Sequence, residues 1–283
     1  MKITGLDLLR HYEEQRTAGK RAPEIAKGLG VGLKGLEKEL TRARKLRDEL
    51  AAAATIRAHT NPVAEVALDC VEGKEYRLLF LSDVHFDSVF CHRDLLAEHL
   101  EKALVTKALV FSFGDLFDAM QGRFDPRRSA EELRPEYRRS DYYDFVVDDL
   151  GDYLLPYLMS LRLLANGNHE ASVLKNCNVN LIDRLVKRLN QDGAAVQAGG
   201  YGGWIRLVLK TSQARRVIRI KYFHGSGGEA PVTRGAIQTN RQAVYLPDAD
   251  VVVNGHSHNA YYIPIGRERV SASGEQYFDL QHH

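Results

Sequence analysis

The sequence contains no run of about 18 apolar residues, so we expect no membrane-spanning helix. Its first residues, MKITGLDLLRHYEEQ, include no apolar stretch of the length found in signal peptides. Only three cysteines occur in 283 residues, and no two form a C-x-x-C pair, which argues against a disulfide framework or a zinc knuckle. These absences predict a cytoplasmic protein with reduced thiols and no membrane partner.

The overall charge is small but unevenly distributed. The net charge is +2, yet residues 1–60 carry 13 Lys and Arg against 8 Asp and Glu, and the remainder has an acidic surplus. With 44% hydrophobic and 27% charged residues, the composition excludes a disordered chain. We therefore predict a small basic helical domain over residues 1–60 and a larger domain over residues 61–283.

The basic head contains three segments with helical spacing of apolar residues, the third running from about Leu33 to Ala53. The span EIAKGLGVGLKGLEKEL, with its glycine turn, resembles a helix-turn-helix. Such a unit would place Lys34, Lys38 and Arg42 near the phosphates of DNA or RNA. The alternative is a helical bundle that docks on the body or dimerises, with these charges in solvent.

In the body, five short apolar runs each end in polar residues. The runs are 78–81, 108–113, 161–165, 217–223 and 251–253. The side chains that follow them are Asp83, His85, Asp115, Asn168, His169, His224, His256 and His258. Most of these runs are apolar on both faces, as buried strands are. Because sites in α/β proteins form at the carboxyl ends of strands, we expect an α/β fold in which these side chains converge.

The residue types in this set indicate metal chemistry. Mixed oxygen and imidazole ligands suit Mn, Fe, Zn or Ni better than Mg or Ca. A single catalytic metal takes about three protein ligands, whereas two metals bridged by one carboxylate use nearly the whole set. We predict two divalent ions, with Mn²⁺ favoured and Fe, Zn or Ni as alternatives.

In order, D-x-H, G-D-x-x-D, G-N-H-E, H and G-H-x-H over residues 66–265 resemble the calcineurin-like metallophosphoesterase superfamily. The resemblance implies an αββα sandwich of two stacked mixed β-sheets. The ligands it implies are Asp83, His85 and His258 for the first metal and Asn168, His224 and His256 for the second, with Asp115 as the bridge. It also implies that His169 stabilises or protonates the leaving oxygen, and that Asp118 orients this histidine.

The spacing of the motifs looks closest to metallophosphoesterases of bacteriophages and prophages, which would place the protein in a bacterial or phage-infected cell. The D-R-G motif of the protein phosphatase branch is absent after the second motif. Asp87 and Glu170 are predicted to support ligands rather than to bind metal. His92 and His99 lie on a predicted helix and are left out of the site.

Residues 119–160 are predicted to form an insertion or cap. Its arginines, including Arg127 and Arg128, could clamp substrate phosphates, and Tyr137, Tyr142 and Tyr143 could stack bases. The alternative is an exposed cap whose arginines pair with nearby acidic residues. Arg234 is a further candidate for substrate contact.

The function we infer is hydrolysis of phosphodiester bonds by a hydroxide shared between two metals. The basic head favours nucleic acid as substrate, and hence a nuclease. The alternative is a phosphodiesterase or phosphatase for a nucleotide or cyclic nucleotide, with the head as a docking or dimerisation element. A third reading is a non-catalytic nucleic-acid-binding or regulatory protein with a structural metal site.

Overall fold

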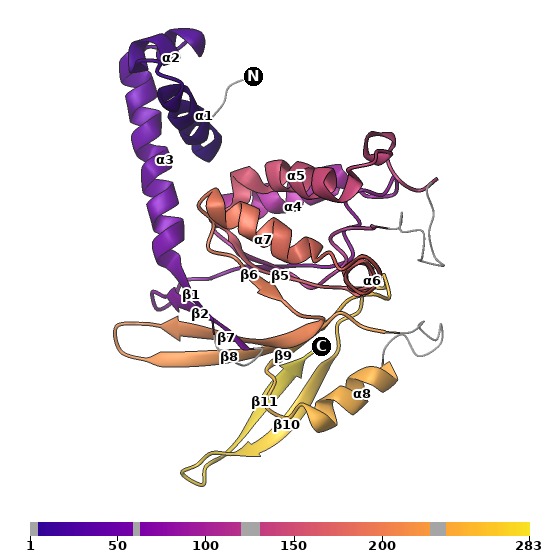
Figure 1. The fold of residues 1–283 in the computed structure, drawn as a ribbon. Coiled ribbons are helices and arrows are strands. Elements are labelled where there is room, and N and C mark those ends of the chain that lie inside the picture. Colours follow the sequence, from indigo (N-terminus) through magenta and orange to yellow (C-terminus); the bar gives the residue numbers. More distant parts are fainter. Residues whose placement is uncertain (1–4, 59–62, 120–130, 227–235) are drawn as a thin grey trace. The chain divides into compact units, whose positions relative to one another are not determined.

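The computed structural model describes residues 5–58, 63–119, 131–226 and 236–283, and the chain divides into two compact units after Ala54 (Figure 1). The sequence analysis placed this boundary at residue 60. Residues Ala54–Ala58 instead form strand β1, which joins the large sheet of the second unit. None of the described helices is long and apolar enough to cross a membrane.

The first unit consists of three helices, as the sequence predicted. They are α1 (Gly5–Thr17), α2 (Ala22–Gly28) and α3 (Leu33–Ala53). Pro23 lies in the first turn of α2, where its missing N–H has no cost, and Gly30 turns the chain with a φ of +68°. A small core holds the helices together, and it is formed by Leu8, Leu9, Ile25, Ala26, Leu36, Leu40 and Ala43.

The second unit contains two β-sheets. The larger has seven strands in the order β1-β2-β7-β8-β9-β11-β10, with parallel and antiparallel pairs. Its strands after β1 are β2 (Val63–Asp69), β7 (Gly202–Lys210), β8 (Arg215–Phe223), β9 (Val251–Asn254), β11 (Gln276–His282) and β10 (Pro264–Val270). The smaller sheet is parallel throughout and consists of β3 (Leu78–Leu81), β4 (Leu109–Ser112), β5 (Leu161–Ala165) and β6 (Gln197–Gly199).

Helices cover the outer sides of the stacked sheets (Figure 1). The layer on the four-stranded sheet comprises α4 (Arg93–Thr106), α5 (Tyr142–Leu154) and α7 (Leu181–Gln191), while α8 (Ala236–Tyr245) lies on the side of the seven-stranded sheet. Between the sheets, the ring of Phe113 stacks on Tyr222 with centroids 5.1 Å apart. This arrangement confirms the expected αββα architecture.

The sequences of the two central strands of the small sheet are apolar apart from Ser112 and Arg162, and the burial of these strands explains this composition. Every residue of β4 and β5 is buried, because helices cover one face of this sheet and the larger sheet covers the other. Short loops and α6 (Asn168–Cys177) follow these strands at their carboxyl ends, where the candidate site lies.

Candidate metal centre

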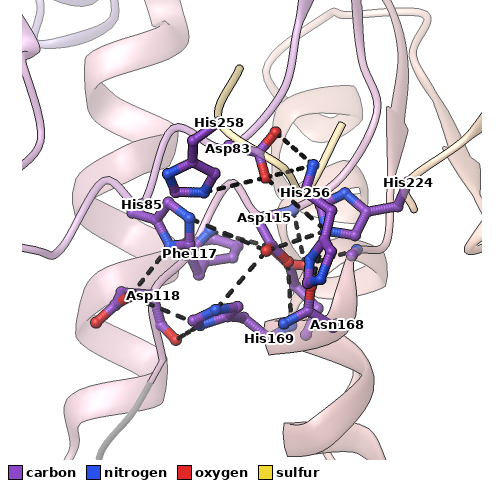
Figure 2. Close-up of polar contacts among 12 residues, drawn as sticks. Asp83, His85, Asp115, Phe117, Asp118, Asn168, His169, His224, His256 and His258 are labelled. Atoms are coloured by element: carbon purple, nitrogen blue, oxygen red, sulfur yellow. Dashed lines mark hydrogen bonds and ion pairs between the residues drawn. The ribbon is translucent and has the colours of Figure 1, made fainter. Parts of the chain in front are cut away.

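The loops that follow β3, β4, β5, β8 and β9 meet in one place and are tied together by their backbones (Figure 2). Asp83 N–H donates to the carbonyl of Gly114 (3.1 Å), and His85 N–H donates to that of Asp115 (2.9 Å). His256 N–H donates to the carboxylate of Asp83 (3.0 Å), and His169 N–H donates to that of Asp115 (3.0 Å). Loops that are far apart in sequence are thereby held in register.

Among the described residues, three groups of potential ligand atoms result, and two of them consist of predicted metal ligands. The third consists of His85, Asp118 and His169, and it shares His85 with the first of these two. In the first, Asp83, His85 and His258 bring one ligand atom each within 4.8 Å of the others. His258 Nε2 lies 3.5 Å from Asp83 Oδ1, and its side chain is 61% exposed, so this group opens to solvent.

The second group is more deeply buried and comprises Asp115, His224 and His256. Asn168 joins it, since its Oδ1 lies 2.9 Å from His224 Nε2 and 2.8 Å from His256 Nδ1. The structure thus brings together the residues that the resemblance assigned to the two metals, in the same two sets.

Asp115 lies between the two groups, with His224 and His256 on one side and His85 and His258 on the other (Figure 2). Its Oδ2 is 3.0 Å from His224 Nε2 and 4.0 Å from His85 Nε2. A single carboxylate therefore reaches toward both sets, which is the placement expected of a bridging ligand.

The hydrogen bonds of His224 and His85 fit bound cations. His224 Nδ1 donates to the carbonyl of Phe113 (3.0 Å), so in the neutral imidazole Nε2 presents a lone pair. That nitrogen faces two oxygens, those of Asn168 and Asp115. Likewise, His85 Nδ1 is hydrogen-bonded to the carboxylate of Asp118. Its buried Nε2 has no hydrogen-bond partner among the described residues. Metal-ligating histidines are held in this way, with one nitrogen anchored and the other aimed at the ion.

The electrostatics of the site also favour positive charge. Burial by itself lowers the pKa of His85 and His224, but hydrogen bonds and negative charge from neighbouring aspartates outweigh it and raise the pKa of both. The carboxylate of Asp115 has a lowered pKa, since its contacts with His224 and His169 outweigh desolvation.

His169 and Asp118 are placed somewhat differently from the expectation. His169 Nδ1 donates to the backbone carbonyl of Asp118, and its Nε2 lies 3.7 Å from Asp115 Oδ2. The carboxylate of Asp118 is hydrogen-bonded to His85 Nδ1 (3.0 Å) and lies 3.6 Å from His169 Nδ1. Asp118 therefore orients His169 through its main chain, while its side chain holds His85.

Glu170 holds together two loops of the candidate metal centre. Its fully buried carboxylate accepts hydrogen bonds from the backbone N–H groups of Asp115 (3.1 Å), Phe117 (3.0 Å) and Gly167 (2.8 Å). Burial and the nearby charge of Asp115 raise the pKa of Glu170 to about 7 despite these bonds. The carboxylate thus ties the loop after β4 to the loop after β5.

Asp87 has a parallel role in the neighbouring loop. It is also fully buried, and it accepts hydrogen bonds from the N–H groups of Asp118 (2.6 Å) and Ala119 (3.0 Å) and from the hydroxyl of Tyr142. Both acids therefore support the loops that carry the candidate ligands, as the sequence analysis expected.

Backbone strain accompanies this convergence. Five candidate ligands have left-handed backbone angles, with φ between 48° and 74°, namely Asp83, His85, Asp115, His256 and His258. Each such residue costs on the order of 1–3 kcal/mol and persists only where surrounding contacts fix it. Strain concentrated in this way is typical of a functional site.

Close approach of the chains also requires glycine. A Cβ on Gly167 would lie 2.1 Å from Asp115 Oδ1 and 2.5 Å from the Asp115 nitrogen. The glycine of the G-N-H-E motif is therefore needed so that Asp115 can reach its position between the two groups.

A cleft of about 750 Å³ opens beside the centre and is lined by residues of both groups. Its other wall contains residues that the sequence analysis set aside or did not consider, namely Phe90, His92, Leu95, Leu96 and His99. From position 92 they follow the spacing i, i+3, i+4 and i+7, which places them on one face of α4 and its N-terminus. This helical spacing in the sequence could have predicted that these residues lie on one face of α4.

The predicted substrate contacts from the insertion are only partly described. Arg127, Arg128 and Arg234 lie outside the described residues. Arg139 forms an ion pair with Asp141, as expected for the alternative in which the arginines of the cap pair with nearby acidic residues. The described segment from 131 onward packs against the body, and α5 contributes to its core.

The tyrosines of this segment do not reach the cleft. Tyr137 is fully buried and donates from its hydroxyl to Asp149, and Tyr142 is 5% exposed. Tyr143 is half-buried and contacts Cys177. None of the three is among the described residues that line the cleft.

Comparison with known proteins identifies one family whose model matches more than half of the chain. The family model described as calcineurin-like phosphoesterase matches residues 76–260. No curated protein sequence matches the chain. Among solved structures, a calcineurin-like phosphoesterase, YfkN from Bacillus subtilis, is similar at 14% identity and a TM-score of 0.29, and the match covers 66% of this chain. The chain spans 64% of the length of that structure.

Proposed function

The chain belongs to the calcineurin-like phosphoesterase family, and from this membership we propose that it is a metal-dependent hydrolase of phosphodiester bonds in nucleic acid. The observation that carries the proposal is the position of Asp115 between two sets of ligand atoms at the edge of an open cleft. Such a centre requires two divalent ions, and Mn²⁺ suits its mixed oxygen and imidazole donors.

When bound, two such ions supply an activated water as nucleophile and neutralise charge on the phosphate oxygens. The residues of the chain provide the remaining functions. Asp83, His85 and His258 form one binding set, Asn168, His224 and His256 form the other, and Asp115 serves both.

His169 completes the machinery as the proton donor to the leaving oxygen. Its Nδ1–H is held by the carbonyl of Asp118, so Nε2 is the atom that carries and releases the proton. This nitrogen faces the cleft beside Asp115, whose Oδ2 is 3.7 Å away.

The test is Mn²⁺-dependent cleavage of an end-labelled single-stranded oligonucleotide, with Asp115→Ala as the matched inactive variant. We expect cleavage by the wild type alone, and the product ladder distinguishes trimming of ends from internal cuts. An intact oligonucleotide from a preparation that still hydrolyses a chromogenic diester would refute the nuclease.

We further propose that the basic head binds nucleic acid as a helix-turn-helix-like unit. Lys34 and Lys38 are exposed one turn apart on α3, and Arg42, which pairs with Glu39, is one turn further along. In the full chain, a Lys34→Ala, Lys38→Ala double variant should weaken oligonucleotide binding. The slope of log affinity against log salt should become shallower by about 0.7 per lost contact.

The control for the head is a double variant of exposed lysines in the second unit, Lys74→Ala and Lys187→Ala. An unchanged salt slope in the Lys34 and Lys38 variant would contradict nucleic-acid binding by the head and favour a docking or dimerisation element.

The second candidate, hydrolysis of a nucleotide or cyclic nucleotide, is favoured by the size of the cleft. Its volume of about 750 Å³ lies within the range of small-molecule sites. A small-nucleotide enzyme should respond weakly to salt, because few phosphate contacts are made.

A further inference from the structure

Resting on the proposed phosphodiester hydrolysis, we propose that Phe90 is the platform on which a nucleobase next to the scissile phosphate stacks. The nucleobase subsite would lie in the wall of the cleft formed by the loop from Phe86 to His92 and the start of α4. This subsite would favour substrates that carry a nucleobase, because a phosphodiester without a base would lack the contact with Phe90.

The position of Phe90 beside the candidate metal centre supports this platform. Phe90 lines the same cleft as His85, Asp115 and His169, so a substrate held at the centre extends toward it. The loop that carries Phe90 follows His85 directly in the chain. A base attached to the phosphate at the centre would therefore lie along this wall.

The exposure of Phe90 supports it as well. The side chain of Phe90 is 71% exposed, and that of Leu95, on the same wall, is 49% exposed. Of the described residues that line the cleft, Phe90 is the sole Phe, Tyr or Trp. The apolar ring is thus presented to the cleft, while the tyrosines that the sequence analysis considered for stacking are engaged elsewhere in the fold.

The loop that carries the exposed ring of Phe90 is held in place by hydrogen bonds. Val89 N–H donates to the carbonyl of Glu132 (2.8 Å), and Phe90 N–H donates to the hydroxyl of Ser88 (3.3 Å). The guanidinium of Arg134 donates to the carbonyls of Ser88 (3.0 Å) and Cys91 (3.1 Å), on either side of Phe90. The backbone is therefore braced on both sides, which reduces the entropy lost when the ring binds a base.

The start of α4 strengthens this brace. The guanidinium of Arg93 donates to the carbonyl of Phe86 and lies over the Phe86 ring, 3.8 Å from its centroid. The same group bonds to the hydroxyl of Tyr137, so this residue of the insertion supports the loop, while Glu132 of the same segment lines the cleft. Arg134 supports the same loop through its hydrogen bonds to the carbonyls of Ser88 and Cys91.

Stacking fits an enzyme without base preference, because every base has a π-face. Removal of one aromatic platform lowers affinity about 5- to 150-fold, converted from the range measured for single stacking contacts. His92 and His99 line the same cleft as Phe90 and offer donors to phosphates or base edges.

The experiment uses the full chain with Mn²⁺ and two substrates, a dinucleotide and the same dinucleotide with tetrahydrofuran in place of each base. The variants are Phe90→Ala and Phe90→Trp. The control is Phe278→Ala on β11, because Phe278 is 73% exposed and does not line the cleft.

We expect the wild type and Phe90→Trp to prefer the base-containing substrate, mainly through KM. In Phe90→Ala this preference should fall about 5- to 150-fold, with the abasic rate and the metal content unchanged. Phe278→Ala should behave as the wild type.

Three results would overturn the inference. Equal hydrolysis of both substrates by the wild type, or an unchanged preference in Phe90→Ala, would refute Phe90 as a base platform. Neither result would contradict the proposed phosphodiester hydrolysis. Hydrolysis of neither substrate, by a preparation active on a chromogenic diester, would exclude nucleotides as substrates altogether.

Discussion

Replacing Glu170 tests whether this buried carboxylate holds the metal centre together. In Glu170→Ala, the N–H groups of Asp115, Phe117 and Gly167 lose their acceptor inside the protein. Each unsatisfied buried donor costs about 1–3 kcal/mol, so the free energy of unfolding should fall by roughly 3–9 kcal/mol. That is a large fraction of the roughly 5–15 kcal/mol of a typical domain.

Glu170→Gln separates hydrogen bonding from side-chain volume. Its amide oxygen can still accept from Asp115 and Gly167, which share Oε2 in the structure, whereas its NH₂ group meets the N–H of Phe117. One bond is lost instead of three. We therefore expect a loss of about 1–3 kcal/mol, clearly smaller than that of the alanine variant.

The assay is urea unfolding with a metal chelator present, so that loss of metal does not contribute to the difference. The single tryptophan, Trp204, lies on β7 in the second unit and reports unfolding of that unit by fluorescence. Glu72→Ala, at an exposed position, is the control. A Glu170→Ala protein that unfolds within about 0.5 kcal/mol of the wild type would refute the reasoning.

Three further substitutions test the centre itself. His169→Ala should keep its metal, measured by metal analysis, yet lose about 10²- to 10⁴-fold in turnover, and a fully active, metal-replete variant would exclude its role as proton donor. Asp118→Asn should weaken metal binding about 10- to 100-fold, because its carboxylate holds His85, while turnover at saturating metal falls less than in His169→Ala. A larger loss of turnover than of metal affinity would instead support direct orientation of His169 by the carboxylate. Gly167→Ala should lose metal and activity together, since its Cβ would lie 2.1 Å from Asp115 Oδ1, and normal metal content would show that the loop can move away.

Much of the fold was predictable because its signals are local. The strand at 78–81 is a continuous apolar run and the strand at 161–165 is apolar apart from Arg162, since both faces of the small sheet are covered. The three helices of the head follow from apolar spacing and glycine turns. Element boundaries were less certain, and residues Ala54–Ala58 form a strand where a helix end and the beginning of a linker were expected.

The candidate ligands were predictable for a related reason. Side chains that follow parallel strands meet at the carboxyl edge of their sheet, and here such edges of both sheets meet, so residue type and strand position together indicate a metal centre. The hydrogen-bond partner of the Asp118 carboxylate within that centre was not predictable. Asp118 was assigned to His169, yet its carboxylate holds His85, because the choice depends on how two loops more than 30 residues apart pack.

Most helices and strands, and the candidate ligands that follow them, could be predicted because they depend on residue type and short-range periodicity. The contacts of those side chains depend on the tertiary structure. Glu170 reaches Asp115 across 55 positions, and Phe90 is exposed in the cleft while Tyr137 and Tyr142 are buried. Such contacts arise from packing between distant segments, which no local pattern of residues encodes.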